Sequence, residues 1–417
     1  MKVAVVGLGM EGNHALHSLL EFGHQVYASD VNEDLNIYVD NFDGRLEVEL
    51  GRHDWEKINS ADAVVISPSL WKRDVLKKIT SKDKIFSKVF PKHRDIFTIG
   101  VTGTNGKTTT AFMIKDILKN SGHKVLIGGN AGGGFDGYTR LMLEVTREDY
   151  DYLIVEVCDM TLDFSRDNFD FDLVVVTNLG WDHMNVHRTM KQYQKSMYDF
   201  IKDKRTVLNK NDELLSSLGD KPFRGDEPCF FDTYTGKLNL IGKYNRQNAA
   251  AACKVAEILD IPEKKIKESL ASFKPVGGRI TELSMDGSRI IIGKTDNVSA
   301  VSAVFGETEF DLVILGTPRE GEYWRFDIFT EVANFNPQYI ILFPGLDDTT
   351  SQAKEILRKN DYKGKIKISG DISEITEFIS THHRNYKTIF IGGNGQDKIT
   401  EIKGVLEGDL LKDFNLN

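Results

Sequence analysis

The sequence predicts an α/β protein built from three consecutive doubly wound domains. Short apolar runs alternate with helix-forming stretches along all 417 residues, which is the pattern of parallel sheets covered by helices. Two glycine turns, at residues 7–12 and 100–106, each join an apolar run to the start of a helix. The passage Lys274–Arg279 combines Pro with Gly and indicates a linker before a third alternating segment.

The first domain is predicted to cover residues 1–94. It opens with the apolar run Val3–Val6, and a helix is expected from about Glu11. Further strands are expected at Gln25–Ser29 and Ala63–Ser67. A charged, Lys-rich passage then ends the domain.

The second and third domains, residues 95–275 and 276–417, repeat this alternation. The expected strands are the run ending at Val101, Lys124–Ile127, Tyr152–Val157, Leu173–Asn178 and Thr206–Asn209, then Arg289–Ile292, Asp311–Leu315, Tyr339–Phe343 and Thr388–Gly392. Short uninterrupted apolar runs are typical of strands buried in a parallel sheet. Because such sheets bind ligands at the carboxyl ends of their strands, the polar residues that follow each strand are the candidate site residues.

The composition is that of an ordinary soluble protein, with 40% hydrophobic and 28% charged residues. The net charge of −9 argues against nucleic-acid or membrane-surface binding, since both favour a basic protein. No apolar run approaches the ~20 residues of a membrane helix, and the first strand leaves no room for a signal peptide. Three scattered cysteines form neither a disulfide framework nor a metal motif. We therefore expect a cytoplasmic protein.

The second glycine turn has the features of a phosphate loop. Gly103 and Gly106 let backbone N–H groups gather around phosphate oxygens at a helix N-terminus, which adds partial positive charge. Lys107 supplies a full positive charge, and the Thr108 hydroxyl is suited to Mg²⁺. Val101 stands where the common eight-residue pattern has its first glycine, so the turn is tighter than usual. We expect it to bind a nucleoside triphosphate.

The first glycine turn, Gly7-Leu8-Gly9-Met10-Glu11-Gly12, has the spacing of a dinucleotide-binding turn. Asp30 ends the second strand at the distance of a ribose-binding carboxylate. NAD binding, another pyrophosphate ligand and a tight turn without a ligand all fit this pattern. We expect a pyrophosphate at the turn and a ribose or base at Asp30.

Polar residues also follow the strands next to the phosphate loop. Glu156 lies near the end of one strand and is expected to hold Mg²⁺. The next strand leads into Thr177-Asn178 and then Asp182-His183, a cluster that favours a functional role for His183. A third glycine passage, residues 128–134, contains Asn130, whose side chain we expect to contact a ligand.

In this order the motifs resemble those of the Mur ligase superfamily, the ATP-dependent amide-forming enzymes of cell-wall precursor synthesis, which have folylpolyglutamate synthases as relatives. The resemblance rests on the run Thr102–Thr109, on Glu156 as the magnesium-binding glutamate, and on Thr177-Asn178 with Asp182-His183 as the TN-xxx-DH motif. It continues with residues 242–250 as the asparagine helix, Gly278-Arg279, the passage Lys294-Thr295-Asp296-Asn297 and the late glycine turn 392–395. The resemblance therefore extends over the whole chain.

The resemblance implies a Rossmann-like N-terminal domain for a UDP-linked substrate, a central P-loop ATPase domain, and a Rossmann-like C-terminal domain that binds the amino acid and closes over ATP. It implies catalytic roles for Lys107, Glu156 and His183, and metal binding by Thr108, Glu156 and His183. The ATP residues it implies are Gly103, Thr104, Asn105, Gly106, Lys107, Thr108, Thr109, Asn245, Asn248, Arg279, Lys294 and Asn297. Those for the UDP-linked precursor are Gly7, Leu8, Gly9, Met10, Asp30, Ser67 and Asn130.

The sequence departs from the family pattern at several positions. Met197 stands where typical members carry a lysine that becomes carbamylated and bridges a second Mg²⁺, and Lys195 lies on a different face of that helix. Tyr244 replaces the usual histidine of the asparagine helix, Ile292 replaces an acidic residue for the ATP ribose, and Asn185 replaces an aspartate. The pattern is most similar to archaeal pseudomurein peptide ligases.

The family reaction forms an amide in two steps. The carboxylate of the precursor takes the γ-phosphoryl group of ATP to give an acyl phosphate, and the amine of a free amino acid then displaces phosphate. ATP and Mg²⁺ are the expected cofactors and a monomer the expected state. A folylpolyglutamate-synthase-like ligase, an NAD-dependent oxidoreductase and a non-ligase ATPase or binding module remain the alternatives.

Overall fold

The computed structural model describes residues 1–417 except 36, 38–43, 72–73, 241 and 415–417. The contacts within the chain divide it into two compact units. The first comprises Met1–Leu179, Lys191–Tyr234 and Gln247–Leu270, and the second comprises Gly180–Met190, Thr235–Arg246 and Ala271–Asn417. The described residues form three sheets, one within each of the predicted ranges 1–94, 95–275 and 276–417. The predicted α/β class is confirmed.

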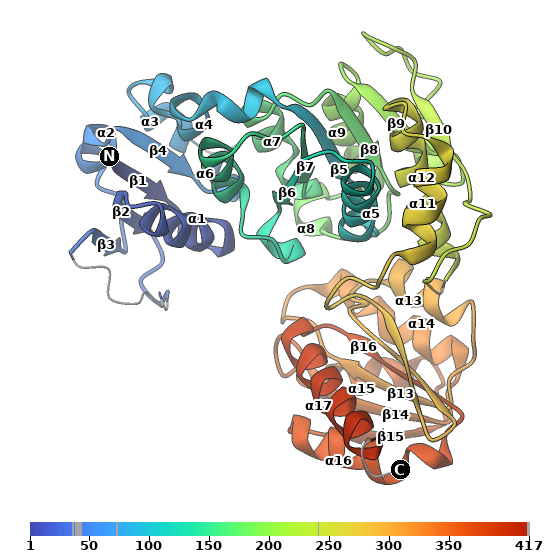
Figure 1. Cartoon of the computed structure of the whole chain (residues 1–417). Coiled ribbons are helices and arrows are strands. Elements are labelled where there is room, and N and C mark those ends of the chain that lie inside the picture. The colour runs from blue at the N-terminus through green and yellow to red at the C-terminus, as the bar shows by residue number, and fades with distance from the viewer. Residues whose placement is uncertain (36, 38–43, 72–73, 241, 415–417) are drawn as a thin grey trace. The chain divides into compact units, whose positions relative to one another are not determined.

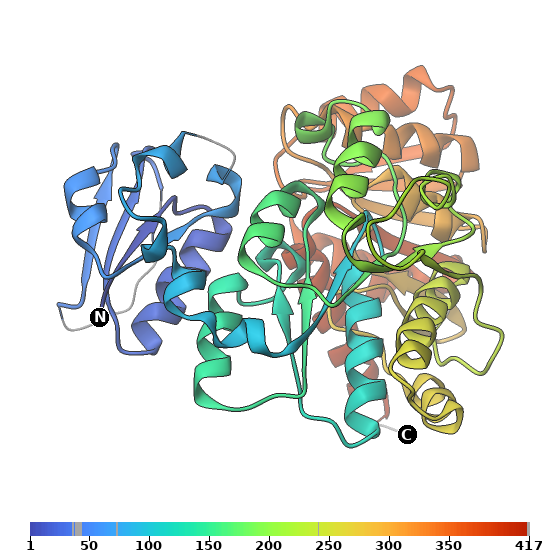
Figure 2. The same ribbon diagram turned by 90° about the horizontal axis from the view of Figure 1, so that it is seen from above.

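The first sheet, drawn in blue in Figures 1 and 2, has the order β3-β2-β1-β4 and is parallel throughout. Its strands are β1 (Lys2–Val6), β2 (Gln25–Asp30), β3 (Leu46–Leu50) and β4 (Ala63–Ile66), and its helices are α1 (Met10–Glu21), α2 (Trp55–Ser60), α3 (Val75–Lys78) and α4 (Phe86–Val89). The sequence does not predict β3, an edge strand in which Glu47 and Val48 are exposed.

The second sheet has six parallel strands in the order β10-β9-β8-β5-β7-β6. They are β5 (Phe97–Thr102), β6 (Val125–Gly129), β7 (Tyr152–Glu156), β8 (Leu173–Val176), β9 (Arg205–Asn209) and β10 (Cys229–Phe231). The helices of this part of the chain are α5 (Lys107–Asn120), α6 (Tyr138–Arg147), α7 (Leu162–Asn168), α8 (Met184–His187), α9 (Met190–Ile201), α10 (Glu213–Ser216), α11 (Lys243–Ile258) and α12 (Glu263–Ser272). Strand β5, which leads into the phosphate loop, is paired on both sides by β7 and β8.

The third sheet lies in the second unit and has the order β11-β12-β16-β13-β14-β15. Its strands are β11 (Thr281–Met285), β12 (Ser288–Ile292), β13 (Leu312–Gly316), β14 (Tyr339–Phe343), β15 (Lys365–Ile368) and β16 (Thr388–Gly393). The hairpin β11–β12 is antiparallel and turns through Asp286 and Gly287, which have φ of 46° and 88°. The other pairs are parallel.

Both faces of the third sheet are covered by helices. Alternate residues of one strand enter different apolar clusters: Val313 and Leu315 pack on one face, and Leu312 and Ile314 on the other. The first cluster includes residues of α13 (Val298–Phe305), α14 (Asp327–Phe335) and α15 (Thr350–Lys359), and the second includes residues of α16 (Ile372–His382) and α17 (Gln396–Phe414). No described helix of the chain is long and apolar enough to span a membrane.

Candidate active site

The phosphate loop joins the carboxyl end of β5 to the first residue of α5. Gly103 and Gly106 have φ of 122° and 84°, a region that favours glycine. A Cβ at Gly103 would lie 2.3 Å from the Thr177 Oγ1, and one at Gly106 would lie 2.2 Å from the Asn248 Oδ1. The loop therefore needs both glycines, and it brings the predicted ATP residue Asn248 against its tip.

The residues after β8 brace this loop. The Asn178 carbonyl accepts the Thr104 N–H at 3.0 Å, and the Asn178 side chain accepts the Asn105 N–H at 2.9 Å. Thr177 Oγ1 and Asn178 Nδ2 both donate to the Asn105 carbonyl, at 2.6 and 2.9 Å. The Thr-Asn pair thus fixes the backbone that would hold the phosphates, a role the sequence alone does not reveal.

The side chains of the loop contact the loop itself and its neighbours. Lys107 Nζ donates to the carbonyls of Gly103 and Thr104, each at 2.8 Å. Thr109 is buried, and the Thr104 hydroxyl lies 3.2 Å from the hydroxyl of buried Tyr193. The ammonium group of Lys107 is therefore held directly over the loop.

Thr108, Glu156 and Asn130 form a buried polar cluster beside the loop. The Thr108 hydroxyl donates to Glu156 Oε2 at 2.6 Å, and Asn130 Nδ2 donates to Glu156 Oε1 at 3.0 Å. Glu156 is fully buried. A hydroxyl and a carboxylate oxygen are ligands that Mg²⁺ prefers, so these residues fit the ion. Among the described residues no group of three or more His, Cys, Asp or Glu could hold a metal.

The N-terminal glycine turn leads from β1 into α1. Gly7 has φ of 88°, and a Cβ there would lie 2.9 Å from the Ser67 Cβ, so Ser67 borders the turn. Asp30 accepts the N–H groups of Leu8 and Asn32 at 2.6 and 2.9 Å. Its carboxylate supports the turn itself, a contact that the sequence does not predict.

Two further predicted precursor residues continue this turn. Gly9 precedes α1 in an extended conformation, with no side-chain hydrogen bond at the helix start. Met10, the first helical residue, has 58% of its surface exposed. The start of α1 is therefore not capped by a side chain of its own.

The remaining predicted residues belong to the second unit. Buried Asp182 accepts the His183 N–H at 2.8 Å and lies 3.4 Å from Asn297 Nδ2. Asn297 also caps α13 by accepting the Ala300 N–H at 3.0 Å. His183 has φ of 51°, an uncommon conformation outside glycine.

Lys294 and Asp296 join this cluster through Arg325. Lys294 Nζ lies 3.1 Å from Asp296 Oδ2, and Arg325 lies 3.4 Å from Asp296 and 3.6 Å from Asp182. Burial alone would raise the pKa of Asp296, but the attraction of Lys294 and Arg325 holds it well below its usual range. Arg325 also donates to Asn394 Oδ1 at 3.1 Å.

Asn245 and Arg279 complete the predicted set. Asn245 is buried in α11. Arg279 follows Gly278, which has φ of 71° and where a Cβ would lie 2.0 Å from Gln396 Nε2. No helix or strand forms over residues 273–280, as predicted for the linker.

Comparison with known proteins finds relatives of this chain. Residues 101–223 match the family model of the Mur ligase middle domain. A UDP-N-acetylmuramoylalanine–D-glutamate ligase from Bacteroides fragilis is 27% identical over 318 residues, which cover 68% of this chain and 70% of the relative. The chain is a homologue of the Mur ligases.

Solved structures of Mur ligases share the fold. A pseudomurein peptide ligase type C from Methanothermus fervidus aligns with a TM-score of 0.61 and 22% identity, covering 97% of this chain and 99% of that one. The MurF ligase from Thermotoga maritima, solved in complex with ADP, aligns with a TM-score of 0.61 and 18% identity, covering 86% and 91%. The match extends over the N-terminal, central and C-terminal ranges.

The Mur ligase homologue differs from the family pattern in the middle of α9. Met197 is fully buried in the apolar interior, and Lys195 is exposed and paired with Asp199 at 2.8 Å. Lys195 therefore does not substitute for the lysine of the family pattern. Tyr244 packs against an apolar cluster, Ile292 is buried within the third sheet, and Asn185 is exposed.

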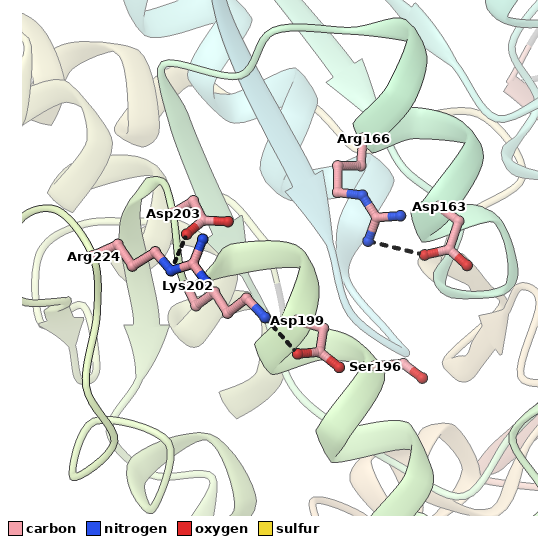
Figure 3. A pocket seen from close by; sticks show the side chains of 7 residues that line it. All are labelled: Asp163, Arg166, Ser196, Asp199, Lys202, Asp203 and Arg224. Carbon is pink, nitrogen blue, oxygen red and sulfur yellow. Dashed lines mark hydrogen bonds and ion pairs between the residues drawn. The ribbon is translucent and has the colours of Figure 1, made fainter.

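One surface hollow of this homologue lies apart from the predicted site residues. It has a volume of about 530 Å³ and is lined by Asp163, Arg166, Ser196, Asp199, Lys202, Asp203 and Arg224. Figure 3 shows each cation turned toward a carboxylate, with distances of 3.1, 2.8 and 3.4 Å for the Arg166–Asp163, Lys202–Asp199 and Arg224–Asp203 pairs. These paired charges describe a solvated surface.

Proposed function

We propose that this chain is an ATP-dependent amide ligase that adds an amino acid to a UDP-linked cell-wall precursor through an acyl phosphate. One observation carries the proposal: a braced phosphate loop holds Lys107 beside the buried cluster of Thr108 and Glu156. The homology to a ligase that acts on UDP-N-acetylmuramoylalanine supports the substrate class.

The proposed chemistry follows from the need to activate a carboxylate. Its oxygen attacks the γ-phosphorus of ATP, ADP leaves, and the amine of the amino acid then attacks the acyl carbon and expels phosphate. Lys107 and the loop N–H groups are assigned to the β- and γ-phosphates. Thr108 and Glu156 are assigned to Mg²⁺, which when bound would neutralise charge on the phosphate oxygens. Asn130 is assigned to orienting Glu156 and contacting the substrate.

The glycine turn at the start of α1 is assigned to the pyrophosphate of the UDP-linked substrate. Its support is the uncapped helix start at Gly9 and Met10, since the first N–H groups of a helix attract phosphate. Leu8, Ser67 and Asp30 would shape that subsite. In the family that the chain resembles, the N-terminal domain binds a UDP-linked substrate and not NAD. This agrees with the assignment and disfavours the oxidoreductase alternative.

The second unit is assigned to the amino acid and to further ATP contacts. His183, Asn245, Arg279, Lys294 and Asn297 keep their predicted roles, and Asp296 and Arg325 add a buried pair of opposite charges next to Lys294. We propose further that the enzyme acts as a cytoplasmic monomer.

The test is ADP release in a coupled assay with UDP-linked acceptors and a panel of amino acids. ADP release that requires both an acceptor and an amino acid supports the ligase. Turnover without consumption of an amino acid would instead indicate an ATPase or binding module, and a requirement for a folate acceptor would indicate the folylpolyglutamate-synthase-like alternative.

Lys107→Ala is expected to abolish ADP release in folded protein, because the charge over the phosphates is lost. Lys119→Ala, which removes an exposed lysine at the other end of α5, is the matched control and should keep full activity. Near-normal turnover in Lys107→Ala would contradict the assignment.

A further inference from the structure

The side chain of Glu11 reaches from the N-terminal glycine turn to the second sheet, within the first unit. Glu11 lies in the first turn of α1. Its Oε1 accepts the Ala131 N–H at 2.6 Å, and its Oε2 accepts the Tyr138 N–H at 3.3 Å. Ala131 begins the short 3-10 helix Ala131–Gly133 after β6, and Tyr138 begins α6. One carboxylate therefore holds both ends of residues 131–138.

The loop that Glu11 holds is packed directly against the proposed magnesium ligand. Asn130, the residue before Ala131, donates its backbone N–H to the Glu156 carbonyl and its side-chain N–H to Glu156 Oε1, both at 3.0 Å. A Cβ at Gly133 would lie 2.0 Å from Glu156 Oε1. Because no free space separates the loop from Glu156, a shift of the loop must move that carboxylate.

The packing around Glu11 is equally close on its other side. Gly137 has φ of 86°, and a Cβ there would lie 3.0 Å from Glu11 Oε2 and 3.2 Å from the His14 Cβ. At the far end of α1, Glu21 pairs with Arg140 of α6 on the surface. The α1–α6 contact is thus anchored by one half-buried and one exposed carboxylate, and of these two carboxylates Glu11 is the one that contacts the loop.

We propose that Glu11 is a positioning residue for the reaction, which sets the Glu156 carboxylate through Ala131 and Asn130 and so couples the precursor-binding turn to the magnesium site. The proposal rests on the proposed function. It assigns Glu11 no contact with ATP, metal or precursor. Its effect is transmitted by two backbone hydrogen bonds and by Asn130.

The experiment compares Glu11→Ala, Glu11→Asp and Glu11→Gln. Alanine removes both acceptors, and aspartate keeps the charge but shortens the reach. Both are expected to lower kcat and raise the Mg²⁺ concentration for half-maximal activity by about 10-fold, the usual cost of losing a group that orients a metal ligand. Glutamine keeps an acceptor for the Ala131 N–H and should remain within about 3-fold of the original enzyme in both.

Glu21→Ala is the matched control, because it removes an α1–α6 contact away from the loop. It should leave kcat and Mg²⁺ dependence unchanged. Equal losses in Glu21→Ala and Glu11→Ala would overturn the proposal, because they would point to general loosening of the helix pair. An unchanged Mg²⁺ dependence in both folded Glu11→Ala and Glu11→Asp would also overturn it.

Calorimetric titration with ATP at several Mg²⁺ concentrations separates this proposal from the proposed function. Weaker Mg²⁺-dependent ATP affinity in Glu11→Ala supports the positioning role even where no acceptor yields an amide product. If the original protein binds ATP but shows no ligase activity, only the proposed ligase reaction would be refuted.

Discussion

Gly106 is one of the two glycines on which the shape of the phosphate loop depends. Its φ is positive, and its missing side chain leaves the space that Asn248 occupies. The two requirements are separate, because one concerns the backbone of the loop and the other concerns its neighbour. A substitution at a glycine that has a positive φ but free space around it can therefore separate the effect of backbone strain from that of a clash with a neighbouring side chain.

Gly106→Ala should abolish measurable ATP affinity, because the new Cβ would lie 2.2 Å from Asn248 Oδ1 and displace the loop. Gly122→Ala provides the control: Gly122 also has a positive φ, of 96°, but no atom lies within 4 Å of the added carbon. Each change should cost about 1 kcal/mol or more in stability through backbone strain. Thermal unfolding and ATP titration check both effects, and equal ATP affinities in the two variants would refute the steric account.

Glu11 should make stability depend on pH. Burial raises its pKa from 4.5 to about 7, against the lowering effect of the Ala131 and Tyr138 N–H groups, and the Glu156 charge adds a smaller rise. The raised pKa means that the folded state favours the protonated form. This stabilisation is complete below pH 4.5 and is lost as the pH rises through 7, a change of about 3 kcal/mol.

The measurement compares thermal unfolding of the original protein and Glu11→Gln at pH 5 and pH 8. Glutamine cannot ionise, so the original protein should lose stability relative to it at the higher pH. Among the described residues, the titratable groups that interact with Glu11 are Glu156 of β7 and Tyr138 of α6, and His14 lies one helical turn further along α1. A difference between the two proteins that does not change with pH would show that Glu11 is not buried as described.

Among the secondary-structure elements, β8 supports the phosphate loop through the two residues that follow it. Thr177 and Asn178 follow its last residue, and their bonds to Thr104 and Asn105 carry the order of the sheet into the loop. Strand β8 thereby contributes to the site through the backbone it fixes. Its Thr-Asn pair can therefore order the loop without touching the nucleotide.

Asn178→Ala should weaken ATP binding by about 10-fold, since two hydrogen bonds that order the loop are lost, each worth about 1 kcal/mol. Asn120→Ala, which removes a hydrogen bond to Ser269 at the other end of α5, should leave ATP affinity unchanged. Calorimetric titration of both variants is the measurement. An affinity of Asn178→Ala equal to that of the control would mean that the loop keeps its shape without this brace.

The central strands could be predicted from the sequence because they are buried on both faces. Tyr339–Phe343 is an unbroken apolar run and forms β14 with the same bounds. The missed strands β3, β10, β11 and β15 lie at sheet edges. In β15, for example, Lys365 and Ile368 are exposed, so no continuous apolar run marks it. A partner strand, more than the local sequence, determines such a segment.

The candidate site divides in the same way. Lys107, Thr108, Glu156 and Asn130 could be predicted together because each lies at or after the carboxyl end of a strand of one parallel sheet, and these ends share an edge. Glu11 could not, since the Ala131 N–H that it accepts lies 120 residues further along the chain. Arg325 meets Asp182 across a comparable distance in sequence. Only the packed structure reveals such contacts.

For the molecule as a whole, the cluster around Arg325 unites distant parts of the second unit. Arg325 lies 3.6, 3.4 and 3.5 Å from the carboxylates of Asp182, Asp296 and Glu322. Asp182 precedes α8, Asp296 precedes α13, and Glu322 lies in the loop after β13. A buried cation shared in this way stabilises the unit mainly because its removal would leave buried carboxylates without a counter-charge.

Arg325→Met should destabilise the protein by about 3–5 kcal/mol, because Asp182 would remain buried without this cation and Asp296 would keep only Lys294. Adding Asp296→Asn should restore part of that loss. Arg384→Met, which breaks an exposed ion pair with Asp286, is the control and should cost less than about 1 kcal/mol. Denaturant unfolding measures all three, and a cost for Arg325→Met as small as that of the control would exclude a buried cluster.

Met197 has a consequence for whether the activity of this enzyme depends on dissolved carbon dioxide. A lysine carbamate forms by uptake of dissolved carbon dioxide, whereas a thioether sealed in an apolar interior takes up none. Lys195 does not offer a replacement, since it projects into solvent and pairs with Asp199. We therefore expect its turnover to be the same in degassed buffer and in bicarbonate-rich buffer, so that the supply of inorganic carbon exerts no control over this step.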